Sequence, residues 1–355
     1  MKVLFVIGQL DIGGIECWLD DLTNLISLKK PDVEIYVLVD KPHKGVLEDK
    51  LSQRGITILR VSSSKISKVS YIKNLFFILK KYKFDVIHSN VSFTNGINSL
   101  LAFIAKVPTR ISHIHSNRNN QKLQRLKKIN FFFLKIFIEL FSTHKIAVSE
   151  QSKNNYLSHK NVLIMPCGIS LKSTVNHEDI KVRKGWDNNI ILLCSVGRLE
   201  SVKNHEFIIK LMPNLPLDYK YIIAGEGSLR EELEQLVRKL NLQNRVIFIG
   251  NITSTISFLK KNANILLFPS HHEGFGVVAI EAQLAGIPVI ASTNVPISTK
   301  ISNAIYYIPS DDKMAWIDKI KNIATENIKL TVDASIFDIK NNYEKLIRIY
   351  TKDDR

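Results

Sequence analysis

Short apolar segments alternate with helical patterns along nearly the whole chain. Strands are expected at Val3–Ile7, Glu34–Val39 and Ile56–Val61 in the first half, and at Ile190–Val196 and Ile265–Phe268 in the second. Between such segments, apolar side chains recur every three or four residues, as on one face of a helix. Buried parallel strands are continuous apolar runs, and strands that alternate with helices favour an open parallel sheet. The pattern therefore predicts an α/β protein.

The length of the chain and one break in the pattern indicate how this α/β structure is divided. At 355 residues the chain exceeds one ordinary core, which suggests two domains of roughly 170 residues each. The polar, charge-rich segment Leu171–Asn189 is interpreted as their connection. We expect an N-terminal domain at 1–172 and a C-terminal domain at 173–335. The last helical pattern, Ile336–Tyr350, places a helix in 336–355 that is expected to return to the first domain.

The cysteine content and the apolar runs predict a cytoplasmic protein. Cys17, Cys167 and Cys194 are odd in number and far apart, so they form neither a disulfide framework nor a zinc pattern. Met1–Gly8 has the pattern of a strand that enters a glycine loop, not of a signal peptide. No apolar run reaches the ~20 residues that span a bilayer.

The formal net charge of +16 implies an anionic partner: nucleic acid, a phosphate-bearing substrate or an anionic membrane. The segment Arg118–Phe141 is basic in its first half and apolar nearly all round in its second. It could be a helix that lies on the cytoplasmic face of an inner membrane, or a buried helix whose basic end is solvated. Both can hold for different halves. No nucleic acid is expected, because the aromatic residues form one apolar block and are not spaced through basic loops.

Two glycine-containing loops follow predicted strands and suit a phosphate. Gly13 and Gly14 precede the first helix, where backbone can approach a ligand closely, although a plain tight turn would have the same sequence. The loop that begins at Gly197 carries Arg198 and Lys203, two cations that can clamp a diphosphate. A basic loop on its own is usually only solvated.

The segment Asn262–Ser292 has the pattern of strand, glycine loop, helix and strand. A loop that enters a helix from a parallel strand presents free backbone N–H groups to an anion. Glu273 and Glu281, eight residues apart, could place one carboxylate at a ligand's far end and the other beside its middle. The alternative is a loop glutamate and a solvated helix glutamate.

Histidines follow another predicted strand. His113 and His115 could be offered to a hydroxyl-rich substrate or could be structural. A metal is not expected, because no third histidine or carboxylate follows at a ligand spacing. His88–Asn98 also follows a strand, at the position where doubly wound sheets bind ligands.

Taken in order, these motifs resemble the retaining nucleotide-sugar glycosyltransferases of the GT-B fold, family four. The N-terminal segments resemble the branch that builds bacterial exopolysaccharide, capsule and O-antigen. The resemblance covers essentially the whole chain. It rests on Gly13–Glu16, Ser112–Arg118, Gly197–Leu199 with Lys203-Asn204, Gly225–Leu229, Phe248–Gly250, Pro269-Ser270, Glu273–Gly276, Glu281-Ala282 and Gly286–Ile290.

The resemblance implies two Rossmann-like domains that face each other across a cleft, with the donor held mainly by the C-terminal one. It makes Arg198, Lys203, Glu273 and His115 the catalytic candidates: the cations neutralise the diphosphate, Glu273 contacts the donor sugar and His115, or else His113, lies near the transferred sugar. Glu281 would hold the ribose hydroxyls. The other implied donor-binding positions are Gly13, Gly14, Gly197, Gly225, Glu226, Ile249, Gly250, Phe275, Gly276 and Val277.

The implied reaction moves a sugar, with retention and without metal or other cofactor, from a UDP-sugar to a hydroxyl of a lipid-linked or oligosaccharide acceptor. A phosphate oxygen would take the acceptor's proton, so neither glutamate is an obvious nucleophile, unlike the carboxylate pair of a glycosidase. Two segments depart from the family pattern. Cys167 stands where asparagine is usual, and Thr293–Lys300 replaces a glycine-containing segment.

Other functions remain open at this point. A nucleotide-sugar epimerase or a sugar phosphorylase could share the fold, although no lysine has a convincing context for pyridoxal phosphate. A basic nucleic-acid-binding protein is the alternative from a different class. A non-catalytic scaffold is disfavoured because Arg198, Lys203, Glu273 and Glu281 are all present.

Overall fold

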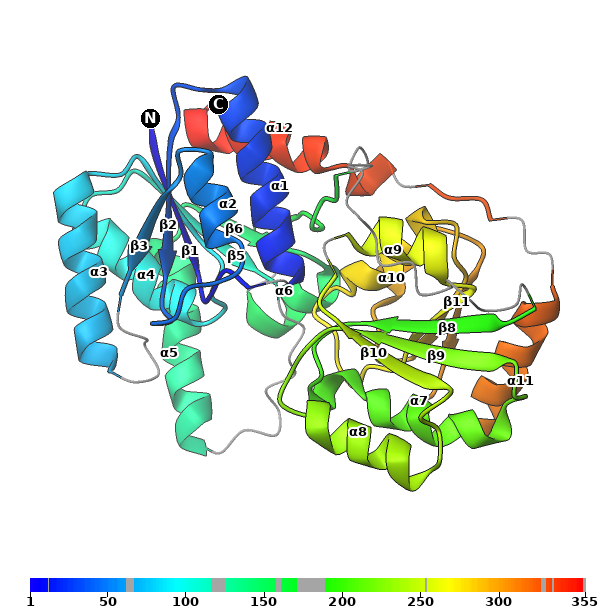
Figure 1. Cartoon of the computed structure of the whole chain (residues 1–355). Coiled ribbons are helices and arrows are strands. Elements are labelled where there is room, and N and C mark those ends of the chain that lie inside the picture. The colour runs from blue at the N-terminus through cyan, green and yellow to red at the C-terminus, as the bar shows by residue number, and fades with distance from the viewer. Residues whose placement is uncertain are drawn as a thin grey trace. The chain divides into compact units, whose positions relative to one another are not determined.

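The computed structural model describes residues 1–355 except 12, 62–66, 116–124, 158–160, 171–188, 253, 327–329, 334 and 354–355. For 125–129 and 336 it describes the backbone alone. The chain divides into two compact units (Figure 1). Unit 1 contains Met1–Leu171 and Ile336–Arg355, and unit 2 contains Lys172–Ser335. Each unit is built on a parallel sheet, so the predicted α/β class is confirmed.

The sheet of unit 1 has the order β3-β2-β1-β4-β5-β6-β7 within the described residues. The chain builds outward from β1 in one direction and then from β4 in the other, so a topological switch point lies between these two strands. The strands are β1 (Lys2–Ile7), β2 (Glu34–Val39), β3 (Thr57–Arg60), β4 (Val86–Ser89), β5 (Thr109–Ile114), β6 (His144–Ala147) and β7 (Val162–Ile164). The helices are α1 (Gly14–Lys29), α2 (Glu48–Gln53), α3 (Lys68–Tyr82), α4 (Thr94–Ile104), α5 (Arg125–Phe141), α6 (Glu150–Tyr156) and α12 (Ile339–Thr351).

Helix α12 belongs to unit 1 although it ends the chain (Figure 1). It packs on α1, where the Trp18 indole donates to Asn342 Oδ1 over 2.7 Å. The Tyr350 hydroxyl lies 2.7 Å from His88 Nδ1 in β4. The helix begins at Ile339 and not at the expected Ile336, because a 3-10 turn precedes it and the Asp338 side chain caps it by accepting from Lys340 N.

The sheet of unit 2 has the order β10-β9-β8-β11-β12-β13 within the described residues. Its switch point lies between β8 and β11. The strands are β8 (Ile191–Val196), β9 (Tyr219–Ala224), β10 (Val246–Gly250), β11 (Ile265–Phe268), β12 (Val289–Ser292) and β13 (Ile305–Ile308). The helices are α7 (His205–Leu211), α8 (Arg230–Lys239), α9 (Thr255–Asn262), α10 (Val277–Leu284) and α11 (Lys313–Thr325). Buried apolar clusters cover the sheet and include Leu193, Tyr221 and Trp316 in one and Cys194, Phe258 and Phe268 in the other.

Helix α4 occupies part of a segment that the sequence suggested as a ligand loop. It begins at Thr94, inside His88–Asn98. The Asn95 side-chain oxygen accepts from Ser89 Oγ over 2.8 Å and from Val91 N over 2.9 Å. The polar residues after β4 therefore satisfy the strand end and the start of a helix.

Helix α5 has both a buried and an exposed apolar face. Leu134 and Ile138 are buried, whereas Phe132, Phe133 and Leu140 are 62%, 53% and 69% exposed. The predicted apolar half is therefore only partly core. Arg118 and Lys122 of the predicted basic half lie outside the described residues. Within the part of the chain that the structure describes, no helix combines the length and apolarity needed to cross a membrane.

Candidate active site

The loops after β8 and β11 meet at the switch point of unit 2. Lys203 Nζ lies 2.6 Å from Glu273 Oε1, and the two side chains are only 17% and 10% exposed. The backbone holds the loops together, since His271 N donates to Val202 O over 2.8 Å. Removing one partner of such a half-buried pair leaves the other charge uncompensated, so the two residues depend on each other.

Arg198 differs from Lys203. Its side chain is exposed and makes no ion pair with a described residue. It therefore adds a cation that an incoming anion can use without breaking an existing contact.

Glycines allow the loops after β8, β9 and β10 to approach through their backbones. Gly225 N donates to Gly250 O over 2.7 Å, and a Cβ on Gly225 would lie 2.1 Å from Gly197 O. Gly225 has φ +139°, and Gly250 has φ +73°. Gly225 is thus required by packing between strand ends, independently of any ligand, whereas Gly250 is favoured by its left-handed backbone.

The two other predicted residues near these strand ends lie at the surface or close to it. Glu226 forms an exposed ion pair with Arg230 over 2.9 Å. The Arg230 guanidinium lies 4.9 Å from the centre of the Phe248 ring. Ile249 is half-buried in β10.

The N-terminus of α10 has the features expected of an anion site. Gly276 is its N-cap with φ +83° and has no side chain with which to cap it. The first turn of a helix presents backbone N–H groups that suit an anion. Phe275 before the turn is buried, and Glu281 is half-buried one turn into the helix.

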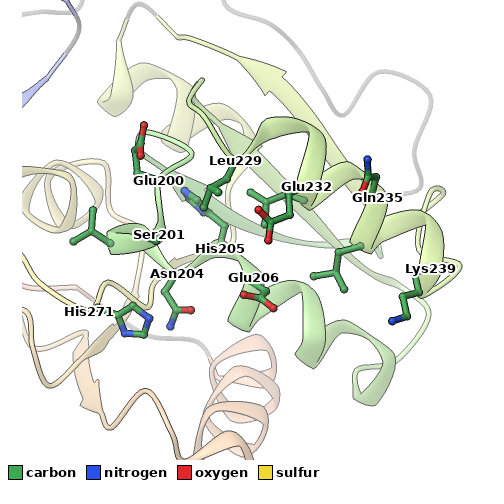
Figure 2. Close-up of a pocket in the computed structure, with 13 residues that line it drawn as sticks. Glu200, Ser201, Asn204, His205, Glu206, Leu229, Glu232, Gln235, Lys239 and His271 are labelled. Carbon is green, nitrogen blue, oxygen red and sulfur yellow. The ribbon is translucent and has the colours of Figure 1, made fainter.

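A separate groove of about 600 Å³ borders the turn that carries Lys203 (Figure 2). It lies between α7 and α8, with Glu206 on one wall and Glu232 and Lys239 on the other. His205, Asn204 and His271 also line it. Arg198, Lys203 and Glu273 do not line it, so the groove is distinct from the charged pair.

In unit 1, both ring nitrogens of His115 already have partners. Nε2 lies 2.9 Å from Asn90 Oδ1 and Nδ1 lies 3.3 Å from Cys167 Sγ. Because Asn90 Nδ2 donates to His88 O, its Oδ1 faces the ring, so Nε2 carries the proton and the thiol donates to Nδ1. Burial lowers the pKa of His115 to about 3, so the ring is neutral. A sugar hydroxyl on His115 would have to replace one of these partners.

The neighbouring histidines are more deeply enclosed. His113 is 3.9 Å from His115 between ring centroids, and its Nδ1 lies 3.1 Å from His88 Nε2. His113 Nε2 has no hydrogen-bond partner among the described residues. No group of three or more potential metal ligands occurs among the residues that the structure describes.

Gly13 and Gly14 lie at the start of α1, as expected. Gly13 is the N-cap, and a Cβ there would lie 2.4 Å from Glu16 Oε2. The carboxylate of Glu16 therefore folds over Gly13 at this helix N-terminus.

Comparison with known proteins identifies the family. Residues 12–173 match the model described as Glycosyltransferase Family 4, and residues 176–335 match Glycosyl transferases group 1. The chain belongs to this glycosyltransferase family. The resemblance on which the sequence analysis rested is therefore confirmed.

Relatives and solved structures agree with this assignment. CapH of Staphylococcus aureus, a capsular polysaccharide biosynthesis glycosyltransferase, is 26% identical over 99% of this chain and 98% of its own length. An Escherichia coli UDP-Gal:alpha-D-GlcNAc-diphosphoundecaprenol alpha-1,3-galactosyltransferase is 24% identical over 92% of this chain and 90% of its own. The structure of Anabaena HepE in complex with UDP-glucose matches with a TM-score of 0.80, 18% identity and coverage of 99% and 100%. The protein is a glycosyltransferase with the GT-B fold of two parallel-sheet domains.

Proposed function

We propose that this glycosyltransferase moves a sugar, with retention, from a UDP-sugar to a hydroxyl of a lipid-linked, growing surface polysaccharide. The observation that carries the proposal is the Lys203–Glu273 pair, with Arg198 exposed on the same loop as Lys203. The donor class is supported by HepE, which is solved with UDP-glucose, and by the UDP-Gal specificity in the name of the E. coli relative. That relative's name also contains a diphosphoundecaprenol acceptor, which supports a lipid-linked acceptor here.

The residues of unit 2 suit the charge changes of this reaction. As the bond between the sugar's anomeric carbon and the β-phosphate oxygen breaks, negative charge grows on the leaving diphosphate, where Arg198 and Lys203 can stabilise it. The acceptor oxygen bonds to the anomeric carbon on the same face, and its proton passes to the leaving phosphate oxygen. Glu273 remains a positioning group, since its carboxylate is held by Lys203 and can accept from a sugar hydroxyl. Neither a metal nor a covalent glycosyl-enzyme is required.

Substitution of the charged pair tests the proposal. We expect Lys203→Ala and Glu273→Ala each to lower turnover by at least about 100-fold, the effect of removing a group that stabilises transition-state charge. The measurement is UDP release from a panel of UDP-sugars by purified protein, with folding checked by circular dichroism. Lys210→Ala is the matched control, because Lys210 forms an exposed ion pair with Glu206 on α7. Near-normal turnover in both pair variants would rule out the assigned roles.

We further propose that unit 1 binds an anionic membrane to reach a lipid-linked acceptor. Phe132, Phe133 and Leu140 are exposed along α5, and Phe103 and Ile104 are exposed at the end of α4, where the Phe103 ring lies 5.3 Å from that of Phe141. Apolar side chains that can enter the headgroup boundary, on a chain of net charge +16, are typical of peripheral membrane binding.

Vesicle binding tests the membrane proposal. Phe132→Ser with Phe133→Ser should weaken binding to anionic vesicles by about tenfold or more, since each phenylalanine that leaves water contributes roughly 1.5–3 kcal/mol. Leu217→Ser, 83% exposed in unit 2, is the control and should bind as the unchanged protein does. Binding should also fall as salt rises. Failure of the unchanged protein to bind anionic vesicles even at low salt would contradict the membrane proposal.

A further inference from the structure

A chain of buried hydrogen bonds joins β8 and β11, the strands that precede the loops of Lys203 and Glu273. Ser195 Oγ in β8 donates to Leu267 O in β11 over 2.6 Å. The Tyr221 hydroxyl in β9 donates to Ser195 Oγ over 2.8 Å. His205 Nδ1, on the first residue of α7, lies 3.5 Å from the same Tyr221 hydroxyl. The chain therefore joins the three strands around the switch point to the start of α7.

His205 lies just after the Gly197–Lys203 loop, which carries the cations Arg198 and Lys203. It follows Lys203 by two residues, and Asn204 between them has a left-handed φ of +54°. The His205 ring is 4% exposed, and Tyr221 and Ser195 are buried. The Lys203 ammonium and the carbonyl groups of Gly197 and Arg198 face the ring. One side chain thus lies against both ends of the loop from Gly197 to Lys203.

The donors in the chain define which nitrogen of His205 carries the proton. Ser195 uses its hydroxyl proton on Leu267 O, and Tyr221 uses its own on Ser195. The Tyr221 oxygen can then only accept from His205, so Nδ1 is the protonated nitrogen. Burial lowers the pKa of His205 to about 4, which keeps the ring neutral. Nε2 has no hydrogen-bond partner among the described residues.

We propose that His205 is a positioning residue whose hydrogen bond to Tyr221 holds the Gly197–Lys203 loop in the conformation that presents Arg198 and Lys203 to the donor's diphosphate. The inference rests on the proposed function, which assigns the diphosphate to those two cations. It adds a residue that touches neither the nucleotide nor the sugar. Without the Tyr221 bond the loop loses one of the contacts that hold it, and the positions of the two cations are less tightly fixed.

Binding of UDP, the part shared by all donors of the proposed class, tests the inference by calorimetry. His205→Phe and Tyr221→Phe keep the aromatic ring and remove the bond, so each should weaken UDP binding by about tenfold, the equivalent of one hydrogen bond. Tyr219→Phe is the matched control, since Tyr219 lies two residues earlier on the same strand and its hydroxyl is outside the chain. His205→Asn offers an amide donor near Nδ1 and should restore binding to within about threefold.

A spectroscopic measurement separates this role from general stability. In protein labelled with ¹⁵N-histidine, the NMR signals of His205 are those that disappear in His205→Phe. Their chemical shifts in the unchanged protein should show the Nδ1–H tautomer. Tyr221→Phe removes the acceptor of that proton, and the ring should then change to the Nε2–H tautomer, which can donate toward the carbonyls of Gly197 and Arg198. Tyr219→Phe should leave the tautomer unchanged.

The outcomes distinguish this inference from the proposed function. An Nε2–H tautomer in the unchanged protein overturns the inference, and so does normal UDP binding by His205→Phe when Lys203→Ala binds poorly. Normal UDP binding by Lys203→Ala contradicts the diphosphate assignment itself. If His205→Phe does not fold, UDP binding by Tyr221→Phe is compared with that of Tyr219→Phe. Normal UDP binding by Tyr221→Phe would then overturn the inference.

Discussion

The two units use buried polar groups in opposite ways. In unit 1, His88, His113 and His115 are buried at the ends of β4 and β5, and their hydrogen-bond partners among the described residues are neutral groups such as Tyr350 and Cys167. In unit 2, the equivalent edge of the sheet carries the Lys203–Glu273 ion pair and the exposed Arg198.

This difference indicates where an anion can bind. The neutral network of unit 1 is largely satisfied by its own side chains, and it fixes α12 through Tyr350. It presents no charge to a diphosphate. The loops of unit 2 carry two cations against one carboxylate at the switch point, so adding a diphosphate there compensates charge. The chemistry of the donor is therefore expected to reside in unit 2.

Acid should destabilise unit 1 more than unit 2. Burial lowers the pKa of His88 and of His115 to about 3, against an ordinary value near 6.5. Only the unfolded chain binds these protons between the two values, so stability is complete above about pH 6.5 and falls as pH drops toward 3. At pH 5 each of these two rings lowers the free energy of unfolding by about 2 kcal/mol, or by about 4 kcal/mol for the pair. In unit 2, burial lowers the pKa of His205 to about 4, and the cost at pH 5 is about 2 kcal/mol.

Tryptophan fluorescence can follow the two units separately. Trp18 packs on His88, His113 and His115, and Trp316 is buried in α11 of unit 2. With Trp186→Phe as background, proteins that keep only Trp18 or only Trp316 report on one unit each. Urea titrations at pH 7.5 and pH 5 should show the larger loss at Trp18. An equal or larger loss of stability reported by Trp316 would show that acid does not destabilise unit 1 more than unit 2.

The sequence predicted the sheets well because parallel strands need continuous apolar runs, such as Ile190–Val196. It missed α4, whose start is marked by Asn95 and Asn98 where a ligand loop was expected. Both asparagines bond to the end of β4, and Asn98 Nδ2 donates to Ser89 Oγ over 2.8 Å. Polar residues that satisfy a strand end and polar residues that bind a ligand have the same appearance in a sequence.

The sequence proposed residues for the candidate site but not the contacts between them. Lys203 and Glu273 were each proposed, yet their ion pair spans 70 positions, and spacing along the chain contains no signal of it. Cys167 was noted as a departure from the family, and only its contact with His115 gives it a structural role. Nothing in the sequence marks Tyr221 or its partner His205 as part of the site, because each fits its strand or helix as an ordinary buried residue.

The glycine at the end of β9 offers a smaller test, directed at unit 2. Gly225→Ala places a Cβ 2.1 Å from Gly197 O at φ +139°, so the loops after β8 and β9 must separate. Gly286→Ala is matched in unit 2 with φ +79°, but nothing lies within 4 Å of its Cβ. We expect a loss of about 1 kcal/mol for Gly286→Ala from backbone strain alone and of about 3 kcal/mol for Gly225→Ala. Urea unfolding followed at Trp316 measures both, and UDP binding should weaken only in Gly225→Ala. Equal losses in the two variants would mean that the close backbone approach at Gly225 does not hold the unit 2 loops together.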